Sequence, residues 1–205
     1  MRSAVILAGG NSKRMTVDKG LTLLHGEPLI LHTKRRIARA VDEVIVVTHT
    51  RLQQQTYQRV LNDTKIILDI IGEGSPVLGA YTGLSNVQGN YAFMTGHDMP
   101  YIDTRVVDQL FDLANGHDAA TPLWPNGYVE PLHSVYRSST GAEQARRLLD
   151  TRELRLRMIL RGLIDVVTLP VEEIRKIDPE LLTLHDIDSP EDLEKAEKLH
   201  NNRHR

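Results

Sequence analysis

Three basic side chains follow a pair of glycines close to the start of the chain. Gly9 and Gly10 end a short apolar run, and Lys13, Arg14 and Lys19 come within the next nine residues. Adjacent glycines let backbone N–H groups approach an anion without a Cβ in the way, and three cations at this spacing suit a triphosphate. The spacing is neither Gly-x-x-x-x-Gly-Lys-Ser/Thr nor Gly-x-Gly-x-x-Gly. It predicts a phosphate-binding loop of another kind, and the alternative is a basic turn exposed to solvent.

A carboxylate stands in the segment Thr95-Gly96-His97-Asp98-Met99-Pro100, at the end of a predicted strand. Asp98 is well placed there to hold Mg²⁺, which usually takes one or two protein carboxylates and completes its octahedron with water and phosphate oxygens. The alternative is that Asp98 caps the following helix, but Asp103 is the better candidate for that cap. The pattern therefore favours Asp98 as a metal ligand.

Two further carboxylates, Asp186 and Asp188, precede the last predicted helix. We expect them to point to opposite faces of an extended segment, so that only one of them faces a shared metal. Capping of the last helix, together with Ser189, is the alternative role for Asp188.

Composition excludes several classes of protein. Lys and Arg number 25 against 27 Asp and Glu, a net charge of −2 over 205 residues, which gives no electrostatic reason to expect nucleic-acid binding. The absence of cysteine excludes disulfides, thiolate nucleophiles, cysteine-based zinc sites and iron–sulfur clusters. Nine histidines show no zinc-binding spacing, and a Gly-x-Ser-x-Gly nucleophile turn is missing.

The first apolar run is too short for a secretory signal. It spans the five residues Ala4–Ala8, and no stretch of the chain approaches the roughly 20 apolar residues of a membrane span. We therefore expect a soluble, cytoplasmic protein without a membrane partner.

The elements that must position these side chains alternate along the chain. Short continuous apolar runs are typical of strands covered on both faces, and intervening helices indicate crossovers between parallel strands. The pattern predicts an α/β fold, a three-layer α/β/α domain with a mostly parallel sheet. Strands are expected at residues 3–8, 44–47, 65–69, 91–95, 118–123, 132–137 and 164–169, and helices at 28–40, 51–61, 76–87, 103–114, 139–149, 153–161 and 190–200.

Two segments in the second half of the chain have a sequence pattern that does not indicate a single role. Residues 124–131 hold two prolines and a glycine, and we interpret them as a functional loop or an inserted hairpin. Residues 146–161 are rich in arginine, which suits either an anionic substrate or a solvent-exposed face. We find no linker or internal repeat, and we expect one domain over residues 1–205.

Six segments resemble, in the same order, those of the molybdenum cofactor guanylyltransferases, a family of nucleotidyltransferases with a Rossmann-like fold. These segments are Leu7–Lys19, Ile67–Asp69, Ser75–Gly79, His97–Pro100, Glu130–Tyr136 and Asp186–Leu193. The resemblance implies transfer of GMP from GTP to the phosphate of molybdopterin, giving pyrophosphate. It implies Mg²⁺ as cofactor, and molybdoenzymes or cofactor-insertion proteins as partners. It assigns about residues 1–100 to the nucleotide and about 101–200 to the acceptor.

The resemblance also implies roles for single residues. Arg14, Lys19 and Asp98 would be catalytic, and Asp98 would hold the metal, with Asp186 or Asp188 as a second ligand. Arg155 and Asp188 would face the acceptor. The nucleotide would contact Leu7, Ala8, Gly9, Gly10, Lys19, Thr48, Asp69 and Asp98.

Several positions depart from the family pattern. Thr16 stands where glycine is usual, Ser75 and Leu78 replace glycine and alanine, and Asp186 and Asp188 replace two asparagines. The two aspartates are compatible with two hypotheses, namely that one of them is a second Mg²⁺ ligand or that the acceptor differs from that of the family. The alternatives to the guanylyltransferase are a cytidylyltransferase, a guanylyltransferase for another phosphorylated acceptor, and a non-catalytic nucleotide-binding protein that delivers cofactor. The Ala8-Gly9-Gly10 sequence favours GTP over CTP.

Overall fold

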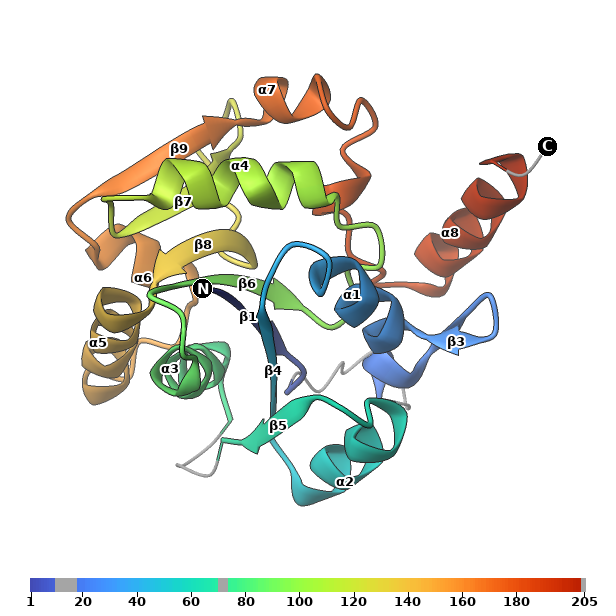
Figure 1. The fold of residues 1–205 in the computed structure, drawn as a ribbon, viewed down its shortest axis with the longest axis horizontal. Helices are drawn as coiled ribbons and strands as arrows, with labels where there is room; N and C mark the ends of the chain where they lie inside the picture. Colours follow the sequence, from blue (N-terminus) through green and yellow to red (C-terminus); the bar gives the residue numbers. More distant parts are fainter. Residues whose placement is uncertain (10–17, 70–73, 204–205) are drawn as a thin grey trace.

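A seven-stranded sheet forms the centre of the computed structural model, which describes residues 1–9, 18–69 and 74–203. The strand order is β5-β4-β1-β6-β8-β7-β9 (Figure 1). Strand β8 is antiparallel to its neighbours β6 and β7, whereas the other neighbouring pairs are parallel, as the sequence predicted. The strands are β1 (Arg2–Leu7), β4 (Glu43–Thr48), β5 (Lys65–Leu68), β6 (Tyr91–Gly96), β7 (Ala119–Leu123), β8 (His133–Arg137) and β9 (Val166–Pro170).

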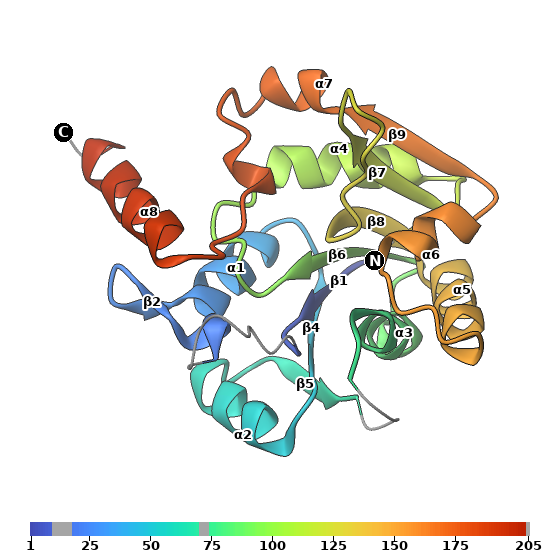
Figure 2. The ribbon, with the colours of Figure 1, turned by 180° about the vertical axis from the view of Figure 1, so that it is seen from behind.

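Helices cover both faces of this sheet and confirm the predicted three layers (Figures 1 and 2). Helices α1, α2, α4 and α7 pack on one face, α3, α5 and α6 pack on the other, and α8 projects from the end opposite α5. Their bounds are α1 (Leu29–Ile37), α2 (Arg51–Val60), α3 (Pro76–Asn86), α4 (Thr104–Ala114), α5 (Ser138–Asp150), α6 (Arg157–Gly162), α7 (Val171–Arg175) and α8 (Pro190–Arg203). No helix in the described ranges is long and apolar enough to cross a bilayer.

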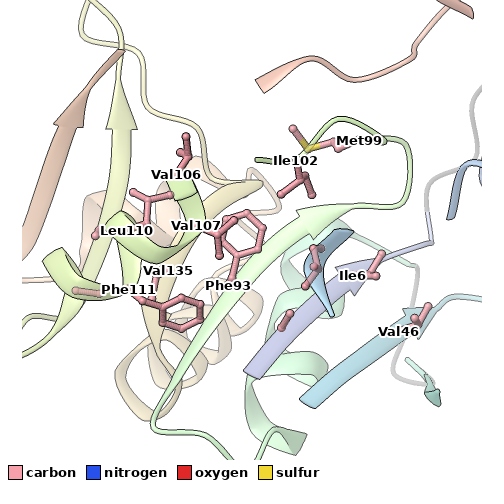
Figure 3. Packing of buried hydrophobic residues seen from close by; sticks show 14 of the residues in the cluster. Ile6, Val46, Phe93, Met99, Ile102, Val106, Val107, Leu110, Phe111 and Val135 are labelled. Carbon is pink, nitrogen blue, oxygen red and sulfur yellow. The ribbon is translucent and has the colours of Figure 1, made fainter. Parts of the chain in front are cut away.

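The core lies between the sheet and these helices. On the α4 side, Phe93 of β6 faces Val107 and Phe111 of the helix, and all three are buried (Figure 3). On the opposite face, Val5 of β1 packs in one cluster with Val77 and Leu84 of α3. Since both faces of the central strands are covered, the continuous apolar runs of the sequence follow from this arrangement.

Three features differ from the sequence-based expectation. A small hairpin, β2 (Leu23–Leu24) with β3 (Glu27–Pro28), precedes α1 and follows the 3₁₀ helix η1 (Lys19–Leu21). A second unexpected segment, α7 with the 3₁₀ helix η2 (Leu182–Leu184), follows the last strand. The helix expected over 153–161 begins only at Arg157, because Arg152 has a φ of 58° and ends the preceding helix α5 in a turn.

Candidate active site

A cavity of about 440 Å³ opens where the parallel strands end. In the pairing of β1 with its neighbours, Leu7 lies opposite Val47 of β4 and Gly96 of β6, so the carboxyl ends of these strands meet at one edge. Ligands of open α/β sheets bind outside such an edge. The cavity is lined by Leu7, Gly9, Val47, Asp69, Gly74, Ser75, Pro76, Gly79, Gly96, His97, Asp98 and Leu132.

Four of the predicted nucleotide-binding residues lie at this cavity, namely Leu7, Gly9, Asp69 and Asp98. Gly10 and Arg14, with the rest of segment 10–17, lie outside the described residues.

Two other predicted nucleotide contacts do not line the cavity with their side chains. Ala8 is buried in the core and its N–H donates to the Val47 carbonyl at 2.8 Å. Thr48 is fully buried and its hydroxyl donates to the Ile67 carbonyl at 3.4 Å. In this structure both residues therefore bond to neighbouring strands at the carboxyl end of the sheet.

Lys19 is held at the beginning of η1 by its neighbours. Asp18 caps this 3₁₀ helix by accepting the Gly20 N–H at 3.2 Å and also accepts the Tyr57 hydroxyl at 2.5 Å. Burial and the Asp18 carboxylate raise the pKa of Tyr57, so the phenol keeps the proton that it donates. A Cβ at Gly20 would lie 2.4 Å from the Tyr57 hydroxyl oxygen and 2.5 Å from His97 Cδ2, so only glycine fits here. The cap by Asp18 and the close packing at Gly20 therefore fix the backbone of Lys19.

The Lys19 ammonium lies between two carboxylates. Its Nζ donates to Asp98 Oδ2 at 2.5 Å and to Asp188 Oδ1. Burial by itself lowers the pKa of Lys19, but Asp98 and Asp188 outweigh that effect and raise the pKa above its usual value. The side chain is therefore a buried, permanently charged cation.

Asp98, Asp186 and Asp188 converge beside this lysine. One oxygen from each lies within 4.8 Å of the others, which makes an acidic cluster able to hold a metal ion. Burial, then the charges of Asp188 and Asp98, raise the pKa of Asp186. Three carboxylates against one ammonium leave the cluster with an excess of negative charge.

The expectation that Asp186 and Asp188 point to opposite faces is wrong. Successive side chains of an extended chain alternate, so the two residues on either side of Ile187 share a face. Ile187 is buried and its N–H donates to the Asp98 carbonyl at 3.0 Å, which turns both carboxylates toward Asp98.

The capping roles fall to other residues. Asp103 accepts the Arg105 N–H at 2.9 Å and caps α4, as predicted, which leaves Asp98 to the cavity. Ser189 accepts the Asp192 N–H at 3.2 Å in the first turn of α8, a contact that Asp188 does not make. Both Asp98 and Asp188 are therefore available to the site.

A second polar pair lies at the other side of the cavity, beyond β4 and β5. Asp69 is buried and accepts a hydrogen bond from His49 Nδ1 at 2.9 Å. Burial raises the pKa of Asp69, while the bond to His49 acts in the opposite direction. His49 was not predicted, although its position directly after a strand was the available signal.

The two histidines that the sequence suggested as neighbours of the site, His97 and His133, differ in position. His97 lines the cavity, its Nδ1 lies 3.1 Å from the Leu7 carbonyl oxygen, and its Nε2 has no partner among the described residues. His133 is fully buried against Phe93, away from the cavity lining.

The structure does not bring Arg155 to the acidic cluster. Its guanidinium is exposed and pairs with Glu153 at 2.5 Å. The acceptor contact of Arg155 stays a prediction.

Sequence comparisons identify relatives along nearly the whole chain. The MobA-like NTP transferase domain matches residues 4–167. A probable molybdenum cofactor guanylyltransferase of Methanosarcina acetivorans is 36% identical over 200 residues, which cover 94% of this chain and 88% of that protein. Another, of Natronomonas pharaonis, is 36% identical over 199 residues, covering 95% and 96%.

Solved structures agree with these relatives. The molybdopterin-guanine dinucleotide biosynthesis protein A of Archaeoglobus fulgidus has a TM-score of 0.84 at 26% identity, covering 98% of this chain and 100% of that chain. A 4-diphosphocytidyl-2C-methyl-D-erythritol synthase of Anaerococcus prevotii, with a TM-score of 0.70 and 14% identity over 98% of both chains, shares the fold alone. Because the family match covers most of the chain and the relatives align along nearly all of it, this protein belongs to the MobA-like NTP transferase family and is a nucleotidyltransferase.

Proposed function

We propose that the protein transfers GMP from GTP to the phosphate of molybdopterin, releasing pyrophosphate. The relatives named molybdenum cofactor guanylyltransferases support the substrates. The observation that carries the proposal is the meeting of a nucleotide-sized cavity with the acidic cluster and Lys19 at one edge of the sheet. The Ala8-Gly9-Gly10 sequence favours GTP over CTP as the donor.

The reaction needs positioning and charge neutralisation more than a protein nucleophile. An oxygen of the acceptor phosphate forms a bond to the α-phosphorus, and the bond from that phosphorus to the oxygen bridging the β-phosphate breaks. Since the acceptor is already an anion, no strong general base is required. In-line placement of two bound substrates and stabilisation of the departing charge supply the rate enhancement.

The acidic cluster fits a divalent metal ion, and we propose that this ion is Mg²⁺. Its three ligands are hard carboxylate oxygens within 4.8 Å of one another, the donor type that Mg²⁺ prefers. Asp98 would be the main ligand, and Asp186 or Asp188 the second. When bound, the ion supplies neutralisation of charge on the triphosphate and on the pyrophosphate.

Lys19 is the proposed partner of the nucleotide phosphates, together with Arg14. Its ammonium neutralises Asp98 and Asp188 in this structure. If these carboxylates held a metal ion, the Lys19 charge would be available to the phosphates of the nucleotide.

Asp69 is the proposed contact of the guanine base or the ribose. A buried carboxylate needs hydrogen-bond donors, and both the edge of guanine and the ribose hydroxyls offer them. His49 already occupies one oxygen of Asp69, which fixes the orientation of the carboxyl group. We further propose that about residues 1–100 serve the nucleotide and 101–200 the acceptor, in a single cytoplasmic domain that hands its product to molybdoenzymes or cofactor-insertion proteins.

Pyrophosphate release with Mg²⁺ and molybdopterin, in separate reactions with GTP, CTP, ATP and UTP, tests the proposal. We expect release with GTP alone. Release with CTP would overturn the base assignment and keep the metal site. Nucleotide binding without any release would favour a different acceptor or a non-catalytic delivery protein.

Asp98→Asn should abolish turnover while the fold persists. The amide keeps the volume of the side chain, and Asp188 still pairs with Lys19, but the metal loses its main anionic ligand. We expect kcat to fall by about a hundredfold or more, with a melting temperature close to that of the wild type.

Asp112→Asn is the matched control for this variant, because Asp112 is an exposed carboxylate on α4 that contacts Arg2. It should leave kcat unchanged. Full Mg²⁺-dependent turnover of the Asp98→Asn variant would disprove the metal assignment.

A further inference from the structure

A second pocket, of about 240 Å³, brings together two segments whose pattern indicated no single role, the loop 124–131 and the arginine-rich segment 146–161. We call it the arginine pocket; its polar lining comprises Thr121, Tyr128, Arg157, Arg161 and Thr168. Tyr128 belongs to the predicted functional loop 124–131, and the arginines belong to the arginine-rich segment 146–161. The pocket therefore lies between α6, the loop 124–131 and the middle of strands β7 and β9.

The loop that carries Tyr128 is tightly tied to itself. Trp124 N–H donates to the Tyr128 carbonyl at 2.9 Å, and Gly127 N–H donates back to the Trp124 carbonyl at 2.9 Å. Gly127 has a φ of 82°, a conformation that favours glycine. The turn is thereby fixed, and Tyr128 is left 45% exposed.

Helix α6 presents both arginines on the same side. Arg157 and Arg161 are four residues apart, so they are neighbours on the helix surface. Ile159 and Leu160 of the same helix are buried in the core, which sets the rotation of α6. Both guanidinium groups are thus turned to the pocket by packing of the helix.

Neither arginine has an ion-pair or hydrogen-bond partner among the described residues, whereas Arg155 is paired with Glu153. Arg157 also lowers the pKa of Glu153, but that carboxylate is already bonded to Arg155. None of the described residues that line the pocket carries a carboxylate. Two unpaired guanidinium groups and the hydroxyls of Tyr128 and Thr168 make a site rich in donors, which suits an anion with several oxygens.

The arginine pocket lies close to the proposed reaction site. The segment 127–132 runs from one to the other, because Tyr128 lines the arginine pocket and Leu132 lines the nucleotide cavity. In agreement, the pKa of Tyr128 is raised by burial and by the charges of Glu130 and Asp186, and Arg157 opposes that rise. The same stretch of chain therefore borders both the arginine pocket and the nucleotide cavity.

We propose that the arginine pocket binds an anionic, oxygen-rich group of the acceptor other than the phosphate that reacts. The assignment rests on the proposed function, since it takes the acceptor phosphate to lie at the acidic cluster. It goes beyond that function because it assigns to Arg157, Arg161 and Tyr128 the recognition of this second anionic group.

Arg157→Gln, Arg161→Gln and the double variant test the proposal, with Arg147→Gln as the matched control. Arg147 is also an exposed helical arginine, but it pairs with Glu143 outside the pocket. We expect each pocket variant to raise the KM for the acceptor about tenfold or more, because a charged hydrogen bond is lost. The KM for GTP and the melting temperature should not change, and Arg147→Gln should change neither KM.

Binding of inorganic molybdate and of inorganic phosphate, followed by NMR shifts of residues 157–161, tests the pocket without turnover. Molybdate should bind the wild type and compete with the acceptor, and the double variant should lose both effects. An unchanged KM for the acceptor in the double variant would overturn the proposal. If molybdate nevertheless bound the wild type in that case, the pocket would be a site for a free ion and not for the acceptor.

The two proposals fail in different ways. If the wild type released no pyrophosphate with any nucleotide, the proposed function would fail. Loss of molybdate binding in the double variant would still support an anion pocket, whereas a wild type that binds neither anion would overturn it.

Discussion

Lys19 shows how one buried charge can be tolerated beside a reaction site. An ammonium removed from water is costly unless it is paired and hydrogen-bonded, and Asp98 and Asp188 provide both. The pairing keeps the lysine charged in the absence of substrate. Under the proposed function, this cation is positioned in advance for the phosphates of the nucleotide.

His133 is a buried histidine whose stability cost depends on pH. Burial lowers its pKa to about 3, from an ordinary value of 6.5. The unfolded chain therefore binds a proton between these two values while the folded one does not, so stability falls as pH decreases below 6.5. At pH 5 the loss is about 2 kcal/mol relative to pH 8.

Urea unfolding at pH 8 and pH 5 checks this prediction. His133→Phe should remove about that share of the pH dependence, while His185→Gln, at an exposed position, should leave it unchanged. An equal loss of stability on acidification in wild type and His133→Phe would contradict the assignment.

The sequence indicated which residues are candidates for the site better than it indicated which side chains surround them. Lys19 and Asp98 were candidates from sequence because cations and carboxylates suit nucleotides and metals, and the structure brings the two side chains into contact. Tyr57 could not be identified, because its contact with Asp18 joins positions 39 residues apart. The shared face of Asp186 and Asp188 was predictable, because side chains two residues apart in an extended segment point the same way; which face they share depends on the burial of Ile187.

Helix α3 lies directly against the central strand β1, and glycine makes this approach possible. A Cβ placed on Gly83 would lie 2.3 Å from Val5 Cγ1, and Val5 is fully buried. The amino end of the same helix, from Pro76 to Gly79, lines the nucleotide cavity. The position of that wall therefore depends on the spacing between helix and strand.

Gly83→Ala should destabilise the fold. Overpacking costs about 1–3 kcal/mol, which exceeds the gain of about 1 kcal/mol in helix propensity. Ser85→Ala, on the exposed side of α3, is the control, because it increases helix propensity without bringing a side chain against β1. Chemical denaturation measures both, and a Gly83→Ala variant as stable as Ser85→Ala would show that α3 moves freely from the sheet.

Most elements were predictable because each has a clear period and a stop signal. The exceptions are short or depend on the fold. The hairpin over Leu23–Pro28 has two-residue strands and shows no alternation to detect. The direction of β8 was not predictable either, since an apolar run looks the same in a parallel and an antiparallel strand.

At the scale of the whole molecule, the site is completed by the segment that precedes α8. Ile187 is buried with Leu24, Leu29 and Ala196, and its N–H bonds to the Asp98 carbonyl. A small apolar cluster, separate from the two main ones, thus sets the distance between the carboxylates.

Ile187→Ala should raise the Mg²⁺ concentration needed for half-maximal activity severalfold, because the segment loses its anchor and Asp186 and Asp188 lose their fixed positions. Ile174→Ala, equally buried on α7, should lower stability by a similar few kcal/mol without this effect. Titration of activity with Mg²⁺ distinguishes them. The same Mg²⁺ requirement in both variants would mean that Asp98 alone sets the affinity.

The ion pair between Lys19 and Asp188 joins positions 169 residues apart. During synthesis, the strands and helices of the nucleotide cavity leave the ribosome first and can begin to pack. The acidic cluster cannot close until the chain has been made as far as residue 188. A nascent chain can therefore gain a nucleotide-shaped cavity before it gains a complete reaction centre, which delays catalysis until the fold is nearly finished.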